Sequence, residues 1–367
     1  MHSLGIKKYA SRGANKLPGL FLCIFALLAQ SSPHSSKQRV IDALAHGAKG
    51  NGVIDDTAAL QSAFGSLGAE DGTVHLPCGT YLVTGELKID TSNTSIQGSG
   101  DCTILKVAGG NSFVALTVSG RGLGAAARVV RDTMPNLHRQ KGRVDEAGCR
   151  PRFSDKAMAS NGARSPMMSD QQIVKVISVS GDTATIEDNF AHDFTLASPH
   201  PRIQGCCPYV QKILAPVSNV IVTKLRIDGK LNTGSESEAL AMNFAVDSEI
   251  AFVNITNFAQ PTGRVTGVRV GTGYHNRFRN ITCTACGNGG GVSFWVFRQS
   301  QATIENLTIG NSSALSEVFG LTVCQPNNST VSNVTVDAGE AKGRPFKLAR
   351  ANHNVSIMSR PRMARAG

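Results

Sequence analysis

The sequence predicts an all-β protein that folds as a single-stranded, right-handed parallel β-helix. Three observations favour this fold class. The carboxyl-terminal half repeats about every 26 residues, apolar and polar residues alternate within each repeat, and no helical apolar spacing is present there. Repeats of this length are typical of solenoids, in which each unit buries its apolar side against the next.

Four segments of the form Asn-x-Thr mark the repeat: Asn254–Thr256, Asn280–Thr282, Asn306–Thr308 and Asn333–Thr335. Their spacings of 26, 26 and 27 residues predict one β-helix coil per repeat. A second strand is expected before each polar corner, within residues 240–246, 267–270, 292–297, 319–323 and 345–348. The four asparagines are expected to stack on one another as a ladder at a bend in the chain.

Residues 1–35 resemble an export signal. Lys7, Lys8, Arg12 and Lys16 precede the apolar run 17–29, which is shorter than the roughly 20 residues of a membrane span. We therefore expect a secreted protein, extracellular or periplasmic, without stable membrane association once the signal is cleaved. A retained single-pass anchor is the alternative.

The segment 45–61 combines a glycine-rich turn with a short helical pattern. Asp55 or Asp56 is expected to cap a helix that runs to about Leu67 and closes the first coils. Residues 72–83 then predict two short strands around a Pro-Cys-Gly corner, and residues 93–105 predict an early coil with a glycine-rich corner.

Residues 47–81, from Gly-Ala-Lys-Gly-Asn-Gly-Val through Leu-Pro-Cys-Gly-Thr-Tyr, resemble the first segment of the pectate-lyase-like superfamily. That superfamily of secreted β-helix proteins includes polygalacturonases, rhamnogalacturonases, exo-glucanases and phage tailspikes. The resemblance implies the fold for most of residues 40–357, and it implies a structural role in the cap for Asp55 and Asp56. It specifies the reaction only weakly.

One β-helix domain is expected over residues 36–357, followed by a tail at 358–367. Within the domain, residues 121–170 form a basic, irregular insert that is expected to be disordered. Apolar alternation at 173–179 and 183–186, around Gly181-Asp182, predicts a β-hairpin directly after it.

The net charge of +11 is unevenly distributed. Residues 1–39, 121–165 and 340–367 each carry six more basic than acidic side chains, so the remaining residues carry a net charge of −7. Nucleic-acid binding would require a basic stripe with interleaved aromatic residues on a folded face, and no such stripe is present. The charge distribution therefore argues against a nucleic-acid partner.

The chain has nine cysteines, of which Cys23 lies in the predicted signal. Cys283 and Cys286 have the spacing of a metal or redox motif, but a second pair at zinc spacing is missing. Packing or a structural bridge is the favoured interpretation for this pair. An exported protein can form disulfides, but the sequence does not assign their pairing.

Candidate functional residues come from corners that are expected to stack in consecutive coils. The candidate catalytic residues are Asp247, His275 and Arg298, and the candidate substrate-binding residues are Arg269, Tyr274, Arg279 and Trp295. The tryptophan could stack on a sugar ring or fill the core. The arginines could bind the carboxylates of an acidic sugar or remain solvated.

Two kinds of chemistry are compatible with these residues. Glycoside hydrolysis requires two carboxylates on opposite sides of the bond, and the polygalacturonase pattern of Asn-Thr-Asp, Asp-Asp, Gly-His-Gly and Arg-Ile-Lys is missing. Lyase chemistry requires an Arg or Lys base beside Ca²⁺ that acidic oxygens hold, and such oxygens are expected near Arg269 from Asp228, Glu236, Glu238 and Asp247. Ca²⁺ is therefore a candidate cofactor, with no calcium-loop pattern to support it.

The sequence thus predicts a secreted, carbohydrate-active β-helix protein. Its expected partner is a polysaccharide, specifically a uronic-acid polymer, on which it would act by lyase or glycoside hydrolase chemistry. The alternative is a polysaccharide-binding, adhesion or tailspike-like surface protein without catalytic activity.

Overall fold

The computed structural model describes residues 39–68, 71–110, 113–128, 175–180, 183–187, 209–233, 236–258, 264–286, 292–310, 319–324, 328–336, 344–349 and 356–359. The predicted export signal, most of the predicted insert and nearly all of the predicted tail lie outside these residues. Among the described residues, none of the helices is both long and apolar enough to cross a membrane.

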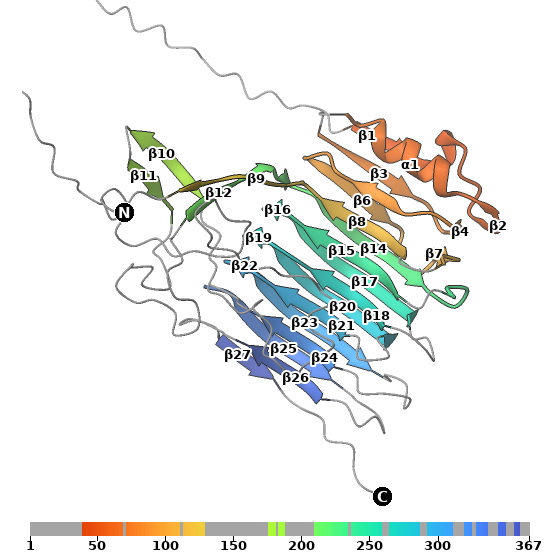
Figure 1. Ribbon diagram of the computed structural model, residues 1–367. Coiled ribbons are helices and arrows are strands. Elements are labelled where there is room, and N and C mark those ends of the chain that lie inside the picture. Colours follow the sequence, from red (N-terminus) through yellow and green to blue (C-terminus); the bar gives the residue numbers. More distant parts are fainter. Residues whose placement is uncertain are drawn as a thin grey trace, which may run out of the picture.

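The described strands form three parallel sheets that run along one axis (Figure 1). Sheet A contains β1 (Arg39–Asp42), β2 (Asn51–Asp55), β3 (Gly72–Leu76), β4 (Gly79–Val83), β6 (Thr94–Gly98), β7 (Thr103–Val107), β14 (Ile221–Asp228), β17 (Glu249–Phe258), β20 (Arg277–Cys286), β23 (Thr303–Gly310), β25 (Thr330–Val336) and β27 (Ser356–Ser359). Sheet B contains β5 (Leu87–Ile89), β8 (Phe113–Ser119), β15 (Glu236–Asn243), β18 (Arg264–Val270), β21 (Val292–Phe297), β24 (Phe319–Cys324) and β26 (Arg344–Ala349). The short sheet contains β13 (Val217–Ser218), β16 (Ala245–Val246), β19 (Gly273–Tyr274) and β22 (Gln299–Ser300).

In the coils from β14 to β23, the chain runs through sheet A, sheet B and then the short sheet before it returns to sheet A. In sheet A, Glu249 pairs with Arg277, Arg277 with Thr303 and Thr303 with Thr330, which gives steps of 28, 26 and 27 residues. This register confirms the predicted parallel β-helix. The corners predicted after sheet B are more regular than expected, because two of them contain the two-residue strands β19 and β22.

The interior is filled by rows of apolar side chains, one from each coil. One row, buried throughout, consists of Val222, Ile250, Phe278, Ile304 and Val331. Phe278 of sheet A meets Phe294 of sheet B edge to face, with ring centroids 6.3 Å apart. Burial of one such side chain stabilises the fold by roughly 1.5–3 kcal/mol. The alternating sequence pattern therefore reflects inward and outward faces of the strands.

The long strands of sheet A bend at a single residue with positive φ. The residues at this bend are Lys224, Phe252, Asn280, Asn306 and Asn333, with φ between 47° and 59°. Asn306 Nδ2 donates to Asn280 Oδ1 at 3.1 Å, and Asn333 Nδ2 donates to Asn306 Oδ1 at 2.6 Å. The predicted asparagine ladder is therefore confirmed for three of its four members.

The prediction was wrong for Asn254, which pairs in register with Thr282. The step into this coil is 28 residues and not 26, so Phe252 takes the place at the bend that Asn254 was expected to fill. The Asn-x-Thr pattern at Asn254 is therefore offset by two residues from the structural repeat.

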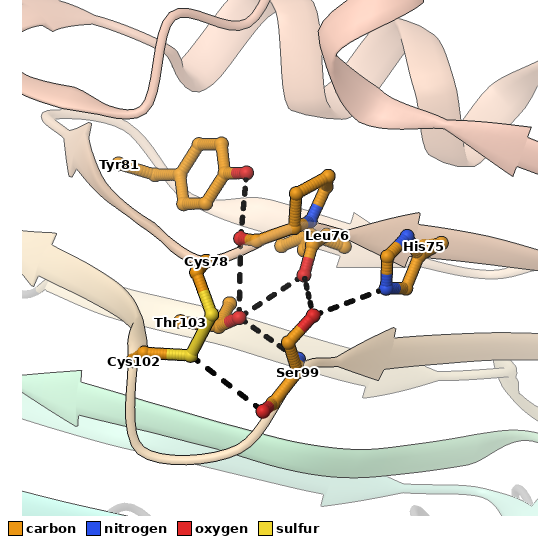
Figure 2. Close-up of a disulfide and its surroundings, with 8 residues drawn as sticks. His75, Leu76, Cys78, Tyr81, Ser99, Cys102 and Thr103 are labelled. Carbon is orange, nitrogen blue, oxygen red and sulfur yellow. Dashed lines mark hydrogen bonds between the residues drawn. A yellow bond between two sulfur atoms is a disulfide. The ribbon is translucent and has the colours of Figure 1, made fainter.

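In the first coils the same bend is a longer corner that a disulfide crosses. Cys78, between β3 and β4, bonds to Cys102, between β6 and β7 (Figure 2). Thr103 Oγ1 donates to the carbonyls of Leu76 and Pro77 at 3.0 and 3.1 Å. Gly98 is required here, since a Cβ atom would lie 2.1 Å from the Lys224 carbonyl oxygen of the next coil. The bridge thus ties together two coils whose corners differ from the later single-residue bends.

The helix α1 (Thr57–Gly65) lies at the amino-terminal end of the stack, and its residues Leu60, Ala63 and Phe64 are buried in the core (Figure 1). A 3₁₀ helix, η1 (Ala43–His46), packs beside it. The predicted capping helix is confirmed, although it ends at Gly65, two residues before the expected Leu67. An end cap of this kind covers an otherwise open edge of the core.

The two aspartates before α1 have different tasks. Asp56, which is 1% exposed, occupies the N-cap position, but its carboxylate accepts hydrogen bonds from Lys49 N at 2.6 Å and Gly50 N at 3.0 Å. Asp55 accepts from Thr57 N at 3.0 Å. Burial alone would raise the pKa of Asp55, but hydrogen bonds from Thr57 and Thr84 outweigh it and lower that pKa. These contacts confirm that the acidic pair has a structural role.

Tyr81→Phe is expected to reduce the loss of stability at high pH. Burial, together with the negative charges of Asp42 and Asp56, raises the pKa of Tyr81 to about 12. An unfolded tyrosine ionises near pH 10, whereas folded Tyr81 stays protonated until about pH 12. The free energy of unfolding of the wild type should therefore fall by roughly 2 kcal/mol between about pH 10 and 12, and Tyr81 should cause no such loss below that range. Denaturant unfolding of both proteins across this range measures the effect. A constant difference between them would contradict it.

At neutral pH the same variant tests the hydrogen bond from Tyr81 Oη to the Pro77 carbonyl, which is 2.9 Å long (Figure 2). Its loss should cost about 1 kcal/mol.

Cys283 and Cys286 lie on the same strand, β20, and are bonded to each other. Residues three apart on a regular strand face opposite sides of a sheet, but both cysteines are buried. The side-chain direction reverses at Ala285, whose φ is 54°, so that Cys283 and Cys286 both face the core. The favoured interpretation of this pair as a structural bridge is therefore confirmed.

The chain leaves the solenoid after β8 and returns before β13. The excursion begins with β9 (Arg121–Arg128) and ends with β12 (Tyr209–Ala215), which pair antiparallel. Residues 121–128 were expected to be irregular, and this was wrong, because pairing with β12 gives them an extended structure that their Gly- and Ala-rich sequence does not reveal. Between them, β10 (Val176–Ser180) and β11 (Thr183–Ile186) form the predicted hairpin.

Candidate functional site

Asp247 and His275 meet at the corner where the short sheet passes into sheet A. Both have positive φ, 50° and 54°, and they occupy equivalent positions in adjacent coils. His275 Nδ1 lies 2.6 Å from Asp247 Oδ1. The side chain of His275 is 46% exposed, and that of Asp247 is 39% exposed. Two of the three predicted catalytic residues therefore form a solvent-accessible pair.

This corner is a second stack of residues with positive φ, which runs through Asn93, Asn219, Asp247, His275, Gln301 and Asn328. In the earlier coils an amide pair occupies the position, with Asn219 Nδ2 donating to Asn93 Oδ1 at 2.8 Å. Asp247 and His275 thus replace structural amides with groups that can exchange protons. The corner directs them outward because the following residue, Ser248 or Asn276, is buried.

Asn276 holds the backbone of the site from inside. Its side chain is fully buried, accepts a hydrogen bond from Ser248 N at 3.0 Å and donates to the Ala245 carbonyl at 2.8 Å. It also donates to Gln299 Oε1 at 3.0 Å. The sequence analysis missed Asn276, although a buried polar residue after each corner residue, as in Ser248 and Ser329, is a repeating signal.

Tyr274 connects this corner to the β10–β11 hairpin. The Tyr274 hydroxyl donates to Glu187 Oε2 at 3.2 Å, and Lys175 Nζ lies 3.4 Å from the same oxygen. The Tyr274 and His275 rings are 6.3 Å apart between centroids. Sequence reasoning missed Glu187 and Lys175, because no repeat relates the hairpin to the coil that it contacts.

The geometry of the pair resembles a base with an orienting carboxylate. When Nδ1–H of His275 donates to Asp247, the other ring nitrogen, Nε2, is left as the acceptor of a proton from a substrate. The carboxylate then stabilises the imidazolium that forms. A tyrosine hydroxyl and a second carboxylate, from Tyr274 and Glu187, lie on the neighbouring side. This corner can therefore support acid–base chemistry.

The third predicted catalytic residue, Arg298, does not join this pair. It lies at the other end of the short strand β22, at the corner with sheet B, and its guanidinium carbon lies 5.6 Å from the Phe297 ring centroid. The predicted repeat correctly placed Arg298 in the coil next to that of His275. It placed Arg298 at the wrong corner of that coil.

Arg269 and Trp295 are register partners on the outer face of sheet B. Trp295 lies between the buried residues Phe294 and Val296 and faces the opposite side of the sheet, tilted against Phe297 with ring centroids 5.2 Å apart. Arg269 Nε contacts Glu238 Oε1 at 2.6 Å. The tryptophan is thus part of an outer row and not of the core.

Trp295 pairs in register with Thr322, so the row continues over consecutive coils. Two polar atoms of this row, Trp295 Nε1 and Thr322 Oγ1, are buried without a hydrogen-bond partner, as is Oε2 of Glu238, the residue that Arg269 contacts. Buried polar atoms usually have partners, and an unpaired one costs roughly 1–3 kcal/mol.

Arg279 lies on the outer face of sheet A, away from Arg269 and Trp295. Its Nε contacts Glu249 Oε1 at 2.6 Å, and its guanidinium carbon lies 5.9 Å from the Phe252 ring centroid. Both arginines that were predicted to bind substrate carboxylates therefore already pair with glutamates of the chain.

Of the four acidic residues proposed as Ca²⁺ ligands, Asp228, Glu238 and Asp247 each pair with a different basic residue, and the side chain of Glu236 lies outside the described part of the structure. Asp228 pairs with Arg226 at the end of β14, Glu238 pairs with Arg269 on sheet B, and Asp247 pairs with His275 at the corner. Within the part of the chain that the structure describes, no group of three or more His, Cys, Asp or Glu residues is arranged to hold a metal ion.

Comparisons with known proteins find a matching family model and similar solved structures. A family model described as rhamnogalacturonase A/epimerase, pectate lyase-like, matches residues 40–193. The tailspike protein gp49 of Pseudomonas phage LKA1 is similar in structure, with a TM-score of 0.51 and 14% identity over 88% of this chain and 59% of the tailspike chain. This chain therefore spans about three fifths of the tailspike's length.

Two further solved structures are less similar. The A-module of the mannuronan C-5 epimerase AlgE4 from Azotobacter vinelandii has a TM-score of 0.40 and 12% identity, over 87% of this chain and 76% of the module. DFA-IIIase from Arthrobacter chlorophenolicus A6 has a TM-score of 0.42 and 11% identity, over 87% of this chain and 66% of that chain. A search of curated proteins finds no match.

Proposed function

We propose that this chain, a parallel β-helix protein whose residues 40–193 match a pectate lyase-like family model, acts on a uronic-acid polysaccharide by removing a proton from the sugar ring. The observation that carries this proposal is the Asp247–His275 pair, 2.6 Å long and open to solvent. The protein names among the structural relatives, an epimerase and a tailspike, are in keeping with a polysaccharide partner.

The proposed reaction begins at C5 of a uronic acid unit, whose hydrogen is acidified by the neighbouring carboxyl group. His275 Nε2 accepts this proton, and Asp247 stabilises the resulting imidazolium. In an elimination, the electrons of the C5–H bond form a C4–C5 double bond, and the C4–O bond breaks. The departing oxygen then takes a proton from water, which reaches this exposed corner.

The substrate carboxylate must be neutralised while its neighbouring carbon loses a proton. Arg277 is exposed and begins strand β20, two residues after His275, so it is the candidate for this role. Lys175, beside Glu187, is a second cation near the same corner. The outer face of sheet B, which carries Arg269 and Trp295 in register, would contact the polymer farther along its length.

The proposal includes export from the cell, which rests on the basic leader and apolar run of residues 1–35. A second candidate function is polysaccharide binding without catalysis, as a surface or tailspike-like protein. It is favoured by the fold likeness to the phage tailspike and by the outer row of sheet B, neither of which requires chemistry.

Assays on polygalacturonate, rhamnogalacturonan, alginate and β-glucan, with and without a calcium chelator, test the proposal. Unsaturated ends that absorb ultraviolet light indicate elimination, and solvent deuterium incorporated at C5 without chain cleavage indicates epimerisation. Reducing ends without that absorbance would indicate hydrolysis and contradict the proposed proton abstraction. Binding without any of these products would favour the second candidate.

A further inference from the structure

The bend of sheet A carries an unexpected side chain. In three successive coils the bend residue is asparagine, but in the coil before them it is Phe252, with φ of 55° and 49% of its surface exposed. Asparagine tolerates positive φ because its short side chain can hydrogen-bond locally. A bulky aromatic residue in this conformation is an outlier.

Three stability arguments favour asparagine at this position. Asparagine would adopt the bend conformation with less strain, remove an exposed apolar ring and extend the ladder by hydrogen bonding to Asn280. The backbone conformation, the exposure of the ring and the asparagine ladder therefore give no reason for Phe252. Strained residues that the architecture does not require are concentrated at functional sites.

One cation contacts the exposed ring, and a second occupies the neighbouring position along the stack. The Arg279 guanidinium carbon lies 5.9 Å from the ring centroid, and exposed Lys224 occupies the same bend position in the preceding coil. An apolar platform flanked by cations presents the groups that recognise the CH face and the carboxylate of an acidic sugar.

We propose that Phe252, with Lys224 and Arg279, forms an accessory binding site for an anionic polysaccharide, separate from the Asp247–His275 corner. This site rests on the proposed function, since it binds another part of the same polymer. Phe252 stacks on a sugar ring, and the two cations attract its carboxylate. Glu249, which pairs with Arg279, limits the net positive charge and so restricts the site to weak, repeated contacts along a chain.

Phe252→Asn separates binding from stability. The variant should unfold at a temperature roughly 2 °C higher than the wild type, because it completes the ladder. Its affinity for polygalacturonate or alginate, measured by titration calorimetry on the full chain, should fall about tenfold. The matched control is Val53→Asn, which also replaces an exposed apolar residue, 78% exposed on β2. The control should leave the affinity unchanged.

If the wild type binds the polymer and the Phe252→Asn variant binds it equally well, the accessory site is overturned and the proposed function still stands. If the wild type binds neither polygalacturonate nor alginate, the proposed function and the accessory site both fail. A fall in affinity of the same size in the Val53→Asn control would also overturn the accessory site.

Discussion

His275→Ala is expected to lower the initial rate on a uronic-acid polymer by about 10²–10⁴-fold, the usual contribution of a positioned acid or base. The loss should appear in kcat with little change in KM, because in the proposed reaction His275 accepts the proton from C5. Product formation is followed by ultraviolet absorbance or by deuterium incorporated at C5. Since the Asp247–His275 pair is exposed, thermal unfolding should change little.

A matched control for this variant is His75→Ala. His75 also makes one hydrogen bond at the surface, with Nε2 3.1 Å from Ser99 Oγ, but it lies on β3, several coils from the site (Figure 2). Its replacement should leave the rate unchanged. A His275→Ala protein with wild-type rate would remove the corner from the reaction. Equal losses in both variants would attribute the effect to folding.

Asp56→Ala is expected to lower the free energy of unfolding by roughly 3–5 kcal/mol, the largest single effect on stability that we anticipate. Its buried carboxylate is the acceptor for Lys49 N and Gly50 N, and alanine would leave both donors without a partner. These donors belong to the glycine-rich turn that leads into α1, so the cap should loosen with them. Denaturant unfolding at neutral pH measures the loss.

The neighbouring carboxylate is the control. Asp55→Ala should cost only about 1 kcal/mol at neutral pH, because Asp55 is exposed. Since its pKa is lowered in the folded protein, the stability it contributes is present above the unfolded value and disappears as the pH falls through the folded one. The gap between this variant and the wild type should therefore close in acid. Similar losses for both aspartates at neutral pH would contradict the distinct roles assigned to them.

The sequence was sufficient to predict the solenoid because its period and its glycine-rich first motif are local properties. The ladder of Asn280, Asn306 and Asn333 follows directly from their spacing. The error at Asn254 arose because coils differ in length by one or two residues, and a local motif can therefore recur out of register. Pairing of backbone hydrogen bonds, and not motif identity, determines which residues stack.

The site was only partly predictable. Spacing brought Asp247 and His275 into adjacent coils, but it did not distinguish the two ends of a two-residue strand, so Arg298 was assigned to the wrong corner. Glu187 was inaccessible to sequence reasoning for a different physical reason. It reaches Tyr274 from an insert outside the repeat, and no periodicity relates positions 87 residues apart.

Phe252 could not be singled out from the sequence, where polar corner residues such as aspartate, histidine and arginine are conspicuous. An exposed phenylalanine looks ordinary in a sequence. It becomes informative only when its backbone angle and its place among asparagines are known.

The excursion between β8 and β13 joins the solenoid at neighbouring points, since Gly120 N donates to the Asn243 carbonyl and Val217 N to the Phe244 carbonyl. Recombination at these two junctions could exchange the excursion for another without rebuilding a single coil. Because Glu187 resides on it, each exchange would alter the surroundings of Tyr274 while the scaffold persisted. Substrate preference could therefore evolve independently of the architecture.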